Sequence, residues 1–391
     1  MSTLKVDGIR SNSASSDAIT LASDGTCTAN ITNNLSNRNL VINGAMQVAQ
    51  RGTSFTTHPS YAVDRFRWGF GNHSAGTVTV SQQSLSSSDT GPWEKGFRKY
   101  NRIALGQAGT AAANTYINLT HKFEAQDVAN SGWNYTSASS FITISFWFRC
   151  STNQTFYGEF QSKDGTSQSY AFSFTASGNN TWTKITKTVP GNSNIQIDND
   201  TGGGFDFRWY PFYGTDYTNN KTLNSWSAYS SSNMLPDMAS TWLTAGASTF
   251  DLTGVQLEVG DHATDFEHRS YGQELALCQR YFQQIGAIGL DGTYTINAGY
   301  LSGSGDYVAT GYTMPVMMRA TPTIANGSTY LQIRNSGGGI DINSYNFIEL
   351  TFPSTFLAIS GVLHQNGGSD NTIVAFTNGP TNGLATLSAE L

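Results

Sequence analysis

The ionisable side chains of this sequence are most densely grouped between residues 258 and 269. The group consists of Glu258, Asp261, His262, Asp265, Glu267, His268 and Arg269. Two of its carboxylates could act as the acid and the nucleophile of glycoside hydrolysis, and Asp261 and Asp265 could bind calcium together with backbone carbonyls. The segment also fits a solvated linker between a strand and a helix. We favour the linker, and predict no catalytic residue and no bound metal.

Aromatic side chains form a second group, in a segment rich in Asn, Ser and Thr. The rings are those of Trp209, Tyr210, Phe212, Tyr213, Tyr217, Trp226 and Tyr229. Exposed rings bind sugars by stacking on their apolar faces, while nearby amides and carboxylates bind the hydroxyl groups. We therefore predict a glycan-contacting set that consists of Tyr213, Tyr217, Trp226 and Tyr229. The alternative is that these rings belong to the core, where most large aromatic side chains lie.

Other recognisable chemistry is missing from the sequence. It has no P-loop, dinucleotide-binding fingerprint, Gly-x-Ser-x-Gly elbow or His-Glu-x-x-His pair. Outside the group described above, the histidines lie far apart, so they do not suggest a transition-metal site. Cys27, Cys150 and Cys278 are too widely spaced for a disulfide framework, and they predict reduced, mostly buried thiols. We predict no cofactor.

Composition narrows the class of protein further. Only 12% of the 391 residues are charged and the net charge is -6, which opposes binding to duplex DNA. Aromatic residues also make up 12% of the chain, too many for a disordered protein. The sequence has neither an apolar run long enough for a membrane span nor the pattern of a signal peptide. We expect a β-rich protein made in a reducing cytoplasm, with no nucleic-acid partner and no membrane insertion.

Residues 1–36 are small and polar, with apolar residues only at isolated positions. Such a segment cannot bury enough surface to fold alone. It is either a disordered tail or an arm that orders against a partner. The extended stretches 18–22 and 26–32 favour strand addition, so we predict a docking arm.

Residues 37–268 show one strand pattern after another. Alternation of apolar and polar residues, as in Ile142–Phe148, is typical of strands with one buried face. Loops rich in Gly, Asn and Ser separate these strands. Residues 287–391 return to strand patterns over a length normal for a second small domain. The sequence thus predicts an all-β fold, with a jelly-roll-like β-sandwich and a smaller C-terminal β-sandwich domain.

A short amphipathic helix is predicted at residues 269–286, between the two β domains. Ser270 and Gln273 have the form of a capping box at its start. The apolar residues at helical spacing include Leu275, Cys278 and Phe282. Two placements stay open. The helix packs around a threefold axis with these three side chains against partner chains, or it plugs one end of its own sandwich.

Several segments resemble proteins of bacteriophage virions. A β-sandwich domain common in tail fibres opens with segments similar to NLVINGAMQVAQRGT at 39–53 and YAVDRFRW at 61–68. It closes with segments similar to GVQLEVG at 254–260, ATDFE at 263–267 and YGQELALCQRYF at 271–282. The chain end, LATLSAEL at 384–391, is also similar to how such proteins finish. The resemblance spans most of the chain from residue 39 onwards.

This resemblance implies a sandwich similar to carbohydrate-binding modules, a homotrimer and a place on the virion. It implies a tail fibre whose residues 1–36 dock on tail or adaptor proteins and whose distal C-terminal domain contacts a host surface glycan. The first alternative is a head fibre or capsid decoration protein, and the second is a polysaccharide depolymerase. Because no catalytic residue comes with the resemblance, we expect a structural protein rather than an enzyme.

Overall fold

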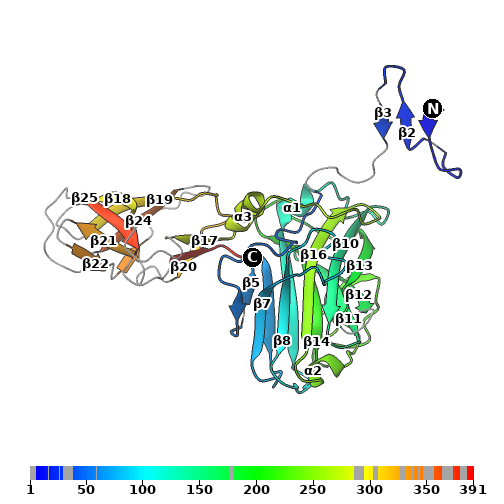
Figure 1. Ribbon diagram of the computed structural model, residues 1–391, viewed down its shortest axis with the longest axis horizontal. Coiled ribbons are helices and arrows are strands. Elements are labelled where there is room, and N and C mark those ends of the chain that lie inside the picture. Colours follow the sequence, from blue (N-terminus) through cyan, green and yellow to red (C-terminus); the bar gives the residue numbers. More distant parts are fainter. Residues whose placement is uncertain are drawn as a thin grey trace.

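The computed structural model describes residues 6–15, 17–25, 27–29, 38–58, 60–175, 180–285, 295–302, 307–325, 331–335, 338–341, 344–346, 356–362, 373–378 and 385–391. Within these residues the chain forms an N-terminal three-stranded sheet, a large β-sandwich and a C-terminal β domain (Figure 1). The predicted all-β class with a jelly-roll-like sandwich is confirmed. Among the described residues, no helix is long and apolar enough to cross a membrane.

The N-terminal sheet pairs three short strands antiparallel in the order β1-β2-β3. They are β1 (Gly8–Ile9), β2 (Ile19–Leu21) and β3 (Cys27–Ala29). The two stretches predicted to be extended therefore contain strands, and these strands pair with each other. Val6, Ile9 and Leu21 keep 39%, 52% and 37% of their surface exposed. The sheet thus leaves its larger apolar side chains without a covering layer in the single chain.

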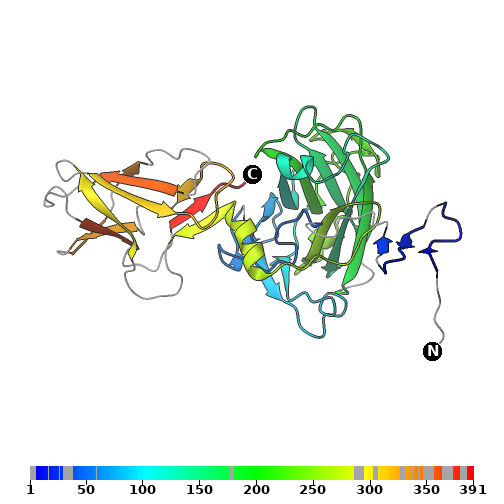
Figure 2. The same ribbon diagram turned by 90° about the horizontal axis from the view of Figure 1, so that it is seen from above.

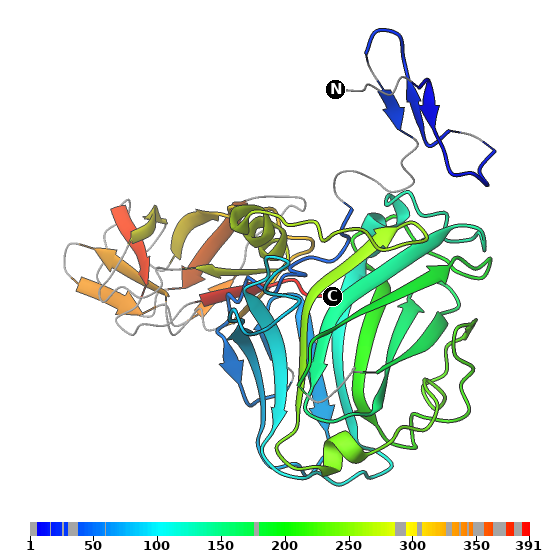
Figure 3. The same ribbon diagram turned by 45° about the vertical axis from the view of Figure 1, so that its right-hand side comes forward.

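Two antiparallel sheets form the sandwich (Figure 3). Sheet I has the order β13-β10-β16-β8-β7-β4 and contains β4 (Ser54–Phe55), β7 (Val78–Ser84), β8 (Lys99–Leu105), β10 (Phe141–Cys150), β13 (Thr183–Pro190) and β16 (Thr249–Val259). Sheet II has the order β15-β12-β11-β14-β9-β6-β5 and contains β5 (Ser60–Val63), β6 (Phe66–Gly71), β9 (Tyr116–Glu124), β11 (Thr155–Ser162), β12 (Gln168–Thr175), β14 (Gly203–Tyr213) and β15 (Trp226–Ala228). Two short helices, α1 (Ala125–Ala129) and α2 (Thr241–Thr244), lie in the connections.

The core lies between the two sheets because the chain repeatedly crosses from one to the other. For example, β9 belongs to sheet II, β10 to sheet I and β11 to sheet II. On β10, the apolar positions of the predicted alternation are buried, since Ile142, Ile144, Phe146 and Phe148 are each at most 1% exposed. The other face is not wet throughout, because Thr143 and Ser145 are 0% and 3% exposed. Their side chains join those of the facing sheet in one apolar cluster. Period-two patterning therefore decides which side chains of β10 enter the apolar core between the sheets.

The segments that resemble the opening and closing of a tail-fibre domain lie side by side. The backbone N–H of Leu40 donates to the carbonyl of Leu257, and that of Val255 donates to the carbonyl of Gly44, both at 2.9 Å. A Cβ atom on Gly44 would lie 2.0 Å from the Val255 carbonyl oxygen. Only glycine permits this approach. The opening segment therefore lies directly against the backbone of strand β16.

Helix α3 (Tyr271–Gln279) starts at the predicted capping box. The Oγ atom of Ser270 accepts from the backbone N–H of Gln273 at 3.3 Å, and Oε1 of Gln273 accepts from the backbone N–H of Ser270 at 3.0 Å. The helix is shorter than the predicted span 269–286, whose last residue lies outside the described residues. It ends early because Phe282 begins strand β17 (Phe282–Ile285), which pairs with the distant strand β26 (Ala385–Ser388).

The helix packs on its own sandwich. Cys278 is fully buried in a cluster with Ile42 and Tyr281, and Leu275 is partly buried against the same cluster. Phe282 is only 5% exposed. The prediction that Cys278 and Phe282 face partner chains is therefore corrected, because both side chains are occupied within the single chain. The structure has the alternative placement, with the helix at one end of its own sandwich.

The C-terminal domain contains an antiparallel sheet of order β22-β21-β25-β18-β19-β24-β23. Its strands are β18 (Thr295–Ser302), β19 (Tyr307–Thr313), β21 (Leu331–Asn335), β22 (Gly338–Asp341), β23 (Ser344–Asn346), β24 (Phe356–Val362) and β25 (Ile373–Asn378). A separate sheet of order β17-β26-β20, with β20 at Thr323–Ala325, lies between this domain and the sandwich (Figure 2). The last strand therefore returns from the C-terminal domain towards the sandwich.

Charged side chains of the sandwich bind the end of the chain. Arg51 and Arg65 both form ion pairs with the carboxylate of Glu390, the first at 2.8 Å. The Nζ atom of Lys122 donates to the carbonyl oxygen of Leu391 at 2.7 Å. Arg65 is only 3% exposed. The final residues, which the sequence placed in the C-terminal domain, thus also form part of the sandwich.

Candidate functional site

Strand β14 divides its side chains between the two faces of sheet II. Phe205, Phe207 and Trp209 belong to the core, whereas Asp206 and Arg208, which lie between them, face outward. Strands β9 and β6, next to β14, have the same alternation. The outward polar side chains of the three strands are Arg67, Asn118, Thr120, Lys122, Asp206 and Arg208. Strand register thus assembles polar groups that lie far apart in the sequence.

A bulge in β14 adds tyrosine rings to this outer face. Tyr210 follows the outward parity of Asp206 and Arg208, and the register with β9 shifts between Trp209 and Phe212, so that Tyr213 also lies outside the main core. Their ring centroids are 4.6 Å apart in an edge-to-face arrangement. Such pairs add about 0.5–1.5 kcal/mol to the stabilisation that burial provides. The bulge therefore places two packed rings beside the outward polar side chains of β6, β9 and β14. We call these side chains the polar rows, and we call the packed rings, starting with Tyr210 and Tyr213, the tyrosine wall.

The segment that follows β14 folds back over sheet II and extends this wall. Met234 and Leu235 are buried in a cluster with Tyr213, and Tyr217 and Tyr229 are partly buried against it. The ring centroids of Tyr213 and Tyr217 are 5.0 Å apart. Tyr217 and Tyr229 therefore keep part of their ring surface accessible beside the polar rows.

A cleft of about 350 Å³ lies between the polar rows and the tyrosine wall. We call it the sheet II cleft. It is lined by Arg67, Asn118, Thr120, Lys122, Lys163, Asp206, Arg208, Tyr213, Tyr217, Tyr229, Ser231 and Met234. Small-molecule sites combine a concave shape with a few placed polar groups, and this cleft has both.

Arg208 is the centre of a buried charge network at this cleft. Its guanidinium lies 2.8 Å from Oδ2 of Asp206 and 3.5 Å from Oε2 of Glu159. The hydroxyl of Tyr210 donates to the same Glu159 oxygen at 2.5 Å. Burial raises the pKa of Glu159, and the charge of Arg208 opposes this rise. Burial lowers the pKa of Arg208, but the neighbouring tyrosine and carboxylates raise it by more, so the guanidinium stays charged.

Buried oxygen atoms around the cleft include hydrogen-bond acceptors that have no partner in the described part of the chain. Two of them, Oδ1 of Asn118 and Oδ1 of Asp206, belong to lining residues, and a third is Oε1 of Glu159. A buried polar atom left without a partner costs about 1–3 kcal/mol. Native proteins contain few such atoms, so the oxygens of Asn118 and Asp206 are acceptors that hydrogen-bond donors of a ligand or of water would satisfy.

The structure brings three of the four predicted ring residues to the cleft. These three are Tyr213, Tyr217 and Tyr229. Trp226 lies elsewhere, with its ring centroid 5.4 Å from that of Tyr170. Its Nε1 atom donates to the carbonyl oxygen of Pro190 at 2.7 Å. Trp226 therefore packs within the sandwich, as the core alternative predicted for it.

The polar side chains of the cleft were not among the predicted site residues. The signal that could have revealed them is a charged residue at an alternate position of an otherwise apolar strand. Asp206 and Arg208 stand in this way between core residues of β14, and Asn118 and Lys122 do so in β9. The strand order that places β6, β9 and β14 side by side is not written in any local pattern.

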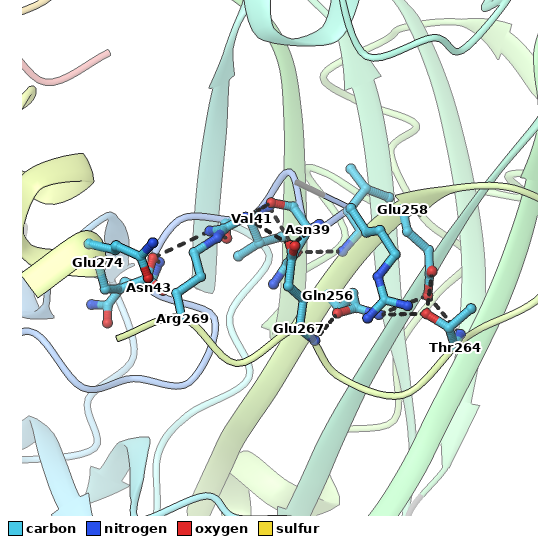
Figure 4. A network of polar contacts seen from close by, with 12 residues as sticks. Asn39, Val41, Asn43, Gln256, Glu258, Thr264, Glu267, Arg269 and Glu274 are labelled. Atoms are coloured by element: carbon cyan, nitrogen blue, oxygen red, sulfur yellow. Dashed lines mark hydrogen bonds and ion pairs between the residues drawn. The ribbon is translucent and has the colours of Figure 1, made fainter. Parts of the chain in front are cut away.

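The ionisable group at 258–269 forms a hydrogen-bonded connection to the opening segment (Figure 4). The carboxylate of Glu258 accepts from the backbone N–H and the hydroxyl of Thr264, at 2.8 Å and 2.6 Å. That of Glu267 accepts from the backbone N–H of Asn39 at 2.8 Å, and Arg269 donates to the Asn39 carbonyl. The linker interpretation fits this arrangement, except that Glu258 is buried rather than solvated.

The two aspartates considered as calcium ligands are engaged separately. Asp261 lies 2.8 Å from the ring of His262, and Asp265 lies 3.7 Å from Lys95. Within the ranges that the structure describes, no group of three or more His, Cys, Asp or Glu side chains could hold a metal ion. Cys150 and Cys278 are buried free thiols, as predicted, whereas the side chain of Cys27 lies outside the described residues.

Comparison with known proteins finds no matching family model and no matching curated protein. Among solved structures, the chain is similar to the enzymatically active domain of bacteriophage CBA120 tailspike protein 4, with 8% identity and a TM-score of 0.30. The match covers 57% of this chain but only 21% of that one. A structure titled "CBM4 structure and function" gives 11% identity, a TM-score of 0.28 and coverage of 56% and 99%. TmCBM61 in complex with β-1,4-galactotriose gives 8%, 0.26 and coverage of 57% and 99%.

Proposed function

We propose that this chain binds a saccharide in the sheet II cleft. The observation that supports it is the placement of partly buried tyrosine rings beside buried oxygen acceptors that lack partners. A sugar ring has an apolar C–H face and a rim of hydroxyl donors, so it can use both kinds of group. The proposal accounts for Tyr217 and Tyr229 on one side of the cleft and for Asn118 and Asp206 on the other.

Replacement of Tyr217 or Tyr229 by alanine tests this proposal. Each variant should weaken binding to host surface polysaccharide about fivefold, because an aromatic contact contributes about 1 kcal/mol. Affinity electrophoresis in gels that contain the polysaccharide measures the change. The matched control is Tyr271→Ala, since Tyr271 is 55% exposed on α3 and does not line the cleft. Equal retardation of all three variants and the wild type would contradict the proposed site.

In this proposal the protein is a structural component of a bacteriophage virion, specifically a tail fibre. The resemblance of residues 39–53 and 254–282 supports this role, and the backbone pairing between the two segments shows that they form one unit. The N-terminal sheet supports docking, because Val6, Ile9 and Leu21 expose apolar surface that a tail or adaptor protein could cover. Labelled electron microscopy should find the chain on tails. Label on capsids would replace the tail fibre with the head fibre or decoration protein.

The proposed fibre is a homotrimer that binds without cleaving its ligand. Weak contacts of single clefts then add up to firm adsorption, because linked sites bind with a high effective concentration. Light scattering should give three times the chain mass of 42.2 kDa; a monomer mass would exclude the trimer.

Incubation with bound polysaccharide should release no reducing ends. Their release, lost on replacement of one carboxylate, would identify a depolymerase instead.

A further inference from the structure

The sheet II cleft concentrates positive charge in a chain whose net charge is -6. Among the ionisable side chains that line it, excluding tyrosines, four are basic and one is acidic. They are Arg67, Lys122, Lys163, Arg208 and Asp206. With the buried carboxylate of Glu159 behind Arg208 included, the side chains keep an excess of two positive charges. A cleft with low-dielectric walls focuses such a field on whatever enters it.

These basic side chains differ in how far carboxylates of the chain already pair with them. Arg208 is neutralised by Asp206 and Glu159. Lys163, with a side chain 35% exposed, lies 3.6 Å from Asp206, which Arg208 already pairs. Arg67 has no hydrogen-bond or ion-pair partner among the described residues. Arg67 and Lys163 are thus the charges most available to a ligand.

Lys122 lies near two of the other basic side chains of the cleft. Its Nζ atom donates to the backbone oxygen of Leu391 at 2.7 Å, and this contact holds it in place. Burial lowers the pKa of Lys122, Asp206 opposes this, and the nearby cations Lys163 and Arg67 lower it further. The side chains of the lining therefore carry more positive than negative charge, although Asp206 lies among them.

We infer that the saccharide bound in this cleft is acidic, and that Arg67 and Lys163 each contact one of its carboxylate or phosphate groups. This inference rests on the proposed function. A charge-assisted contact to the anionic group sets the orientation, while the oxygens of Asn118 and Asp206 accept from hydroxyl groups of the same or the next sugar. A neutral sugar would use the rings and acceptors but leave the basic side chains unmatched.

The test measures binding of the full chain to an array of bacterial surface polysaccharides, some neutral, some carboxylate-bearing and some phosphate-bearing. Arg67→Gln and Lys163→Gln should each weaken binding to the acidic members about tenfold, because each removes one hydrogen bond to a charged group. The matched control is Lys184→Gln. Lys184 is exposed on strand β13 of the opposite sheet, and its loss changes the net charge equally. Added salt should weaken wild-type binding, since the charges are near the surface.

Chemical treatment of the bound polysaccharide distinguishes the source of the anion. Conversion of carboxylates to alcohols should abolish binding of a carboxylate-bearing ligand, and removal of phosphate should do the same for a phosphate-bearing one. Binding to neutral polysaccharides alone, lost in Tyr217→Ala but unchanged in Arg67→Gln, would overturn this inference and leave the proposed function intact. Binding to no saccharide at all would overturn the proposed function and, with it, this inference.

Discussion

Replacement of Arg208 by methionine is expected to lower the free energy of unfolding of the sandwich by about 3–5 kcal/mol, because it removes one partner of a buried charge network. Asp206 and Glu159 are 1% and 0% exposed, and both form ion pairs with Arg208. Without the guanidinium, both carboxylates remain in the protein without their main counter-charge. Chemical denaturation followed by tryptophan fluorescence measures the loss, since Trp209 and Trp242 are fully buried in the core.

Two further variants give this prediction its controls. Arg98→Met removes an exposed guanidinium that stacks on Trp93 and donates to the backbone carbonyls of Trp93 and Phe97. It leaves no buried carboxylate without a counter-charge, so it should change stability by only about 1 kcal/mol. Adding Glu159→Gln to the Arg208→Met chain should restore part of the loss, because one unpaired buried charge disappears. If Arg208→Met unfolded at the same denaturant concentration as Arg98→Met, the network would not be a stabilising element.

The loss in Arg208→Met should also increase with pH. Burial already raises the pKa of Glu159 in the folded protein, and removal of the opposing cation raises it further. A carboxyl group with a higher pKa in the folded state binds more protons when folded. Stability therefore falls as pH rises from the unfolded value through the folded one. The deficit relative to wild type should be smaller near pH 4 than near pH 8; an equal deficit would contradict this account.

Replacement of Glu390 by glutamine is expected to cost about 3–5 kcal/mol of stability at the junction between the sandwich and the chain end. Glu390 is the ion-pair partner of both Arg51 and Arg65. Arg65 cannot regain water when the carboxylate is lost, because it is 3% exposed and its guanidinium carbon lies 3.4 Å from the centroid of the Tyr281 ring. A buried cation without a counter-charge is more costly than an exposed one.

Thermal unfolding and limited proteolysis of the chain end measure this second effect. Glu390→Gln should lower the unfolding temperature and expose residues 385–391 to protease, because β26 is held between β17 and β20 next to the junction. Glu94→Gln is the matched control, since Glu94 is an exposed carboxylate with no ion pair in the described part of the chain. If the two variants behaved alike, the binding of the chain end would add nothing to stability.

The sequence by itself determined the features that depend on neighbouring residues. Alternation in Ile142–Phe148 predicted a strand and its buried face, because successive side chains of a strand point to opposite sides. Ser270 and Gln273 predicted the start of α3, because a capping box is made within one turn. The tyrosines of the cleft could also be found in this way, since they stand close together in the chain.

Only the tertiary structure decided the features that depend on strand order and distant pairing. It ended α3 at Gln279, because the residues from Phe282 onwards find backbone partners in β26 near the end of the chain. It put Arg67 and Asn118 beside Arg208 by making β6, β9 and β14 neighbours, and it turned Trp226 towards Tyr170. Local patterns say which face of a strand points into the core, whereas the neighbours across the other face follow from how the whole chain packs.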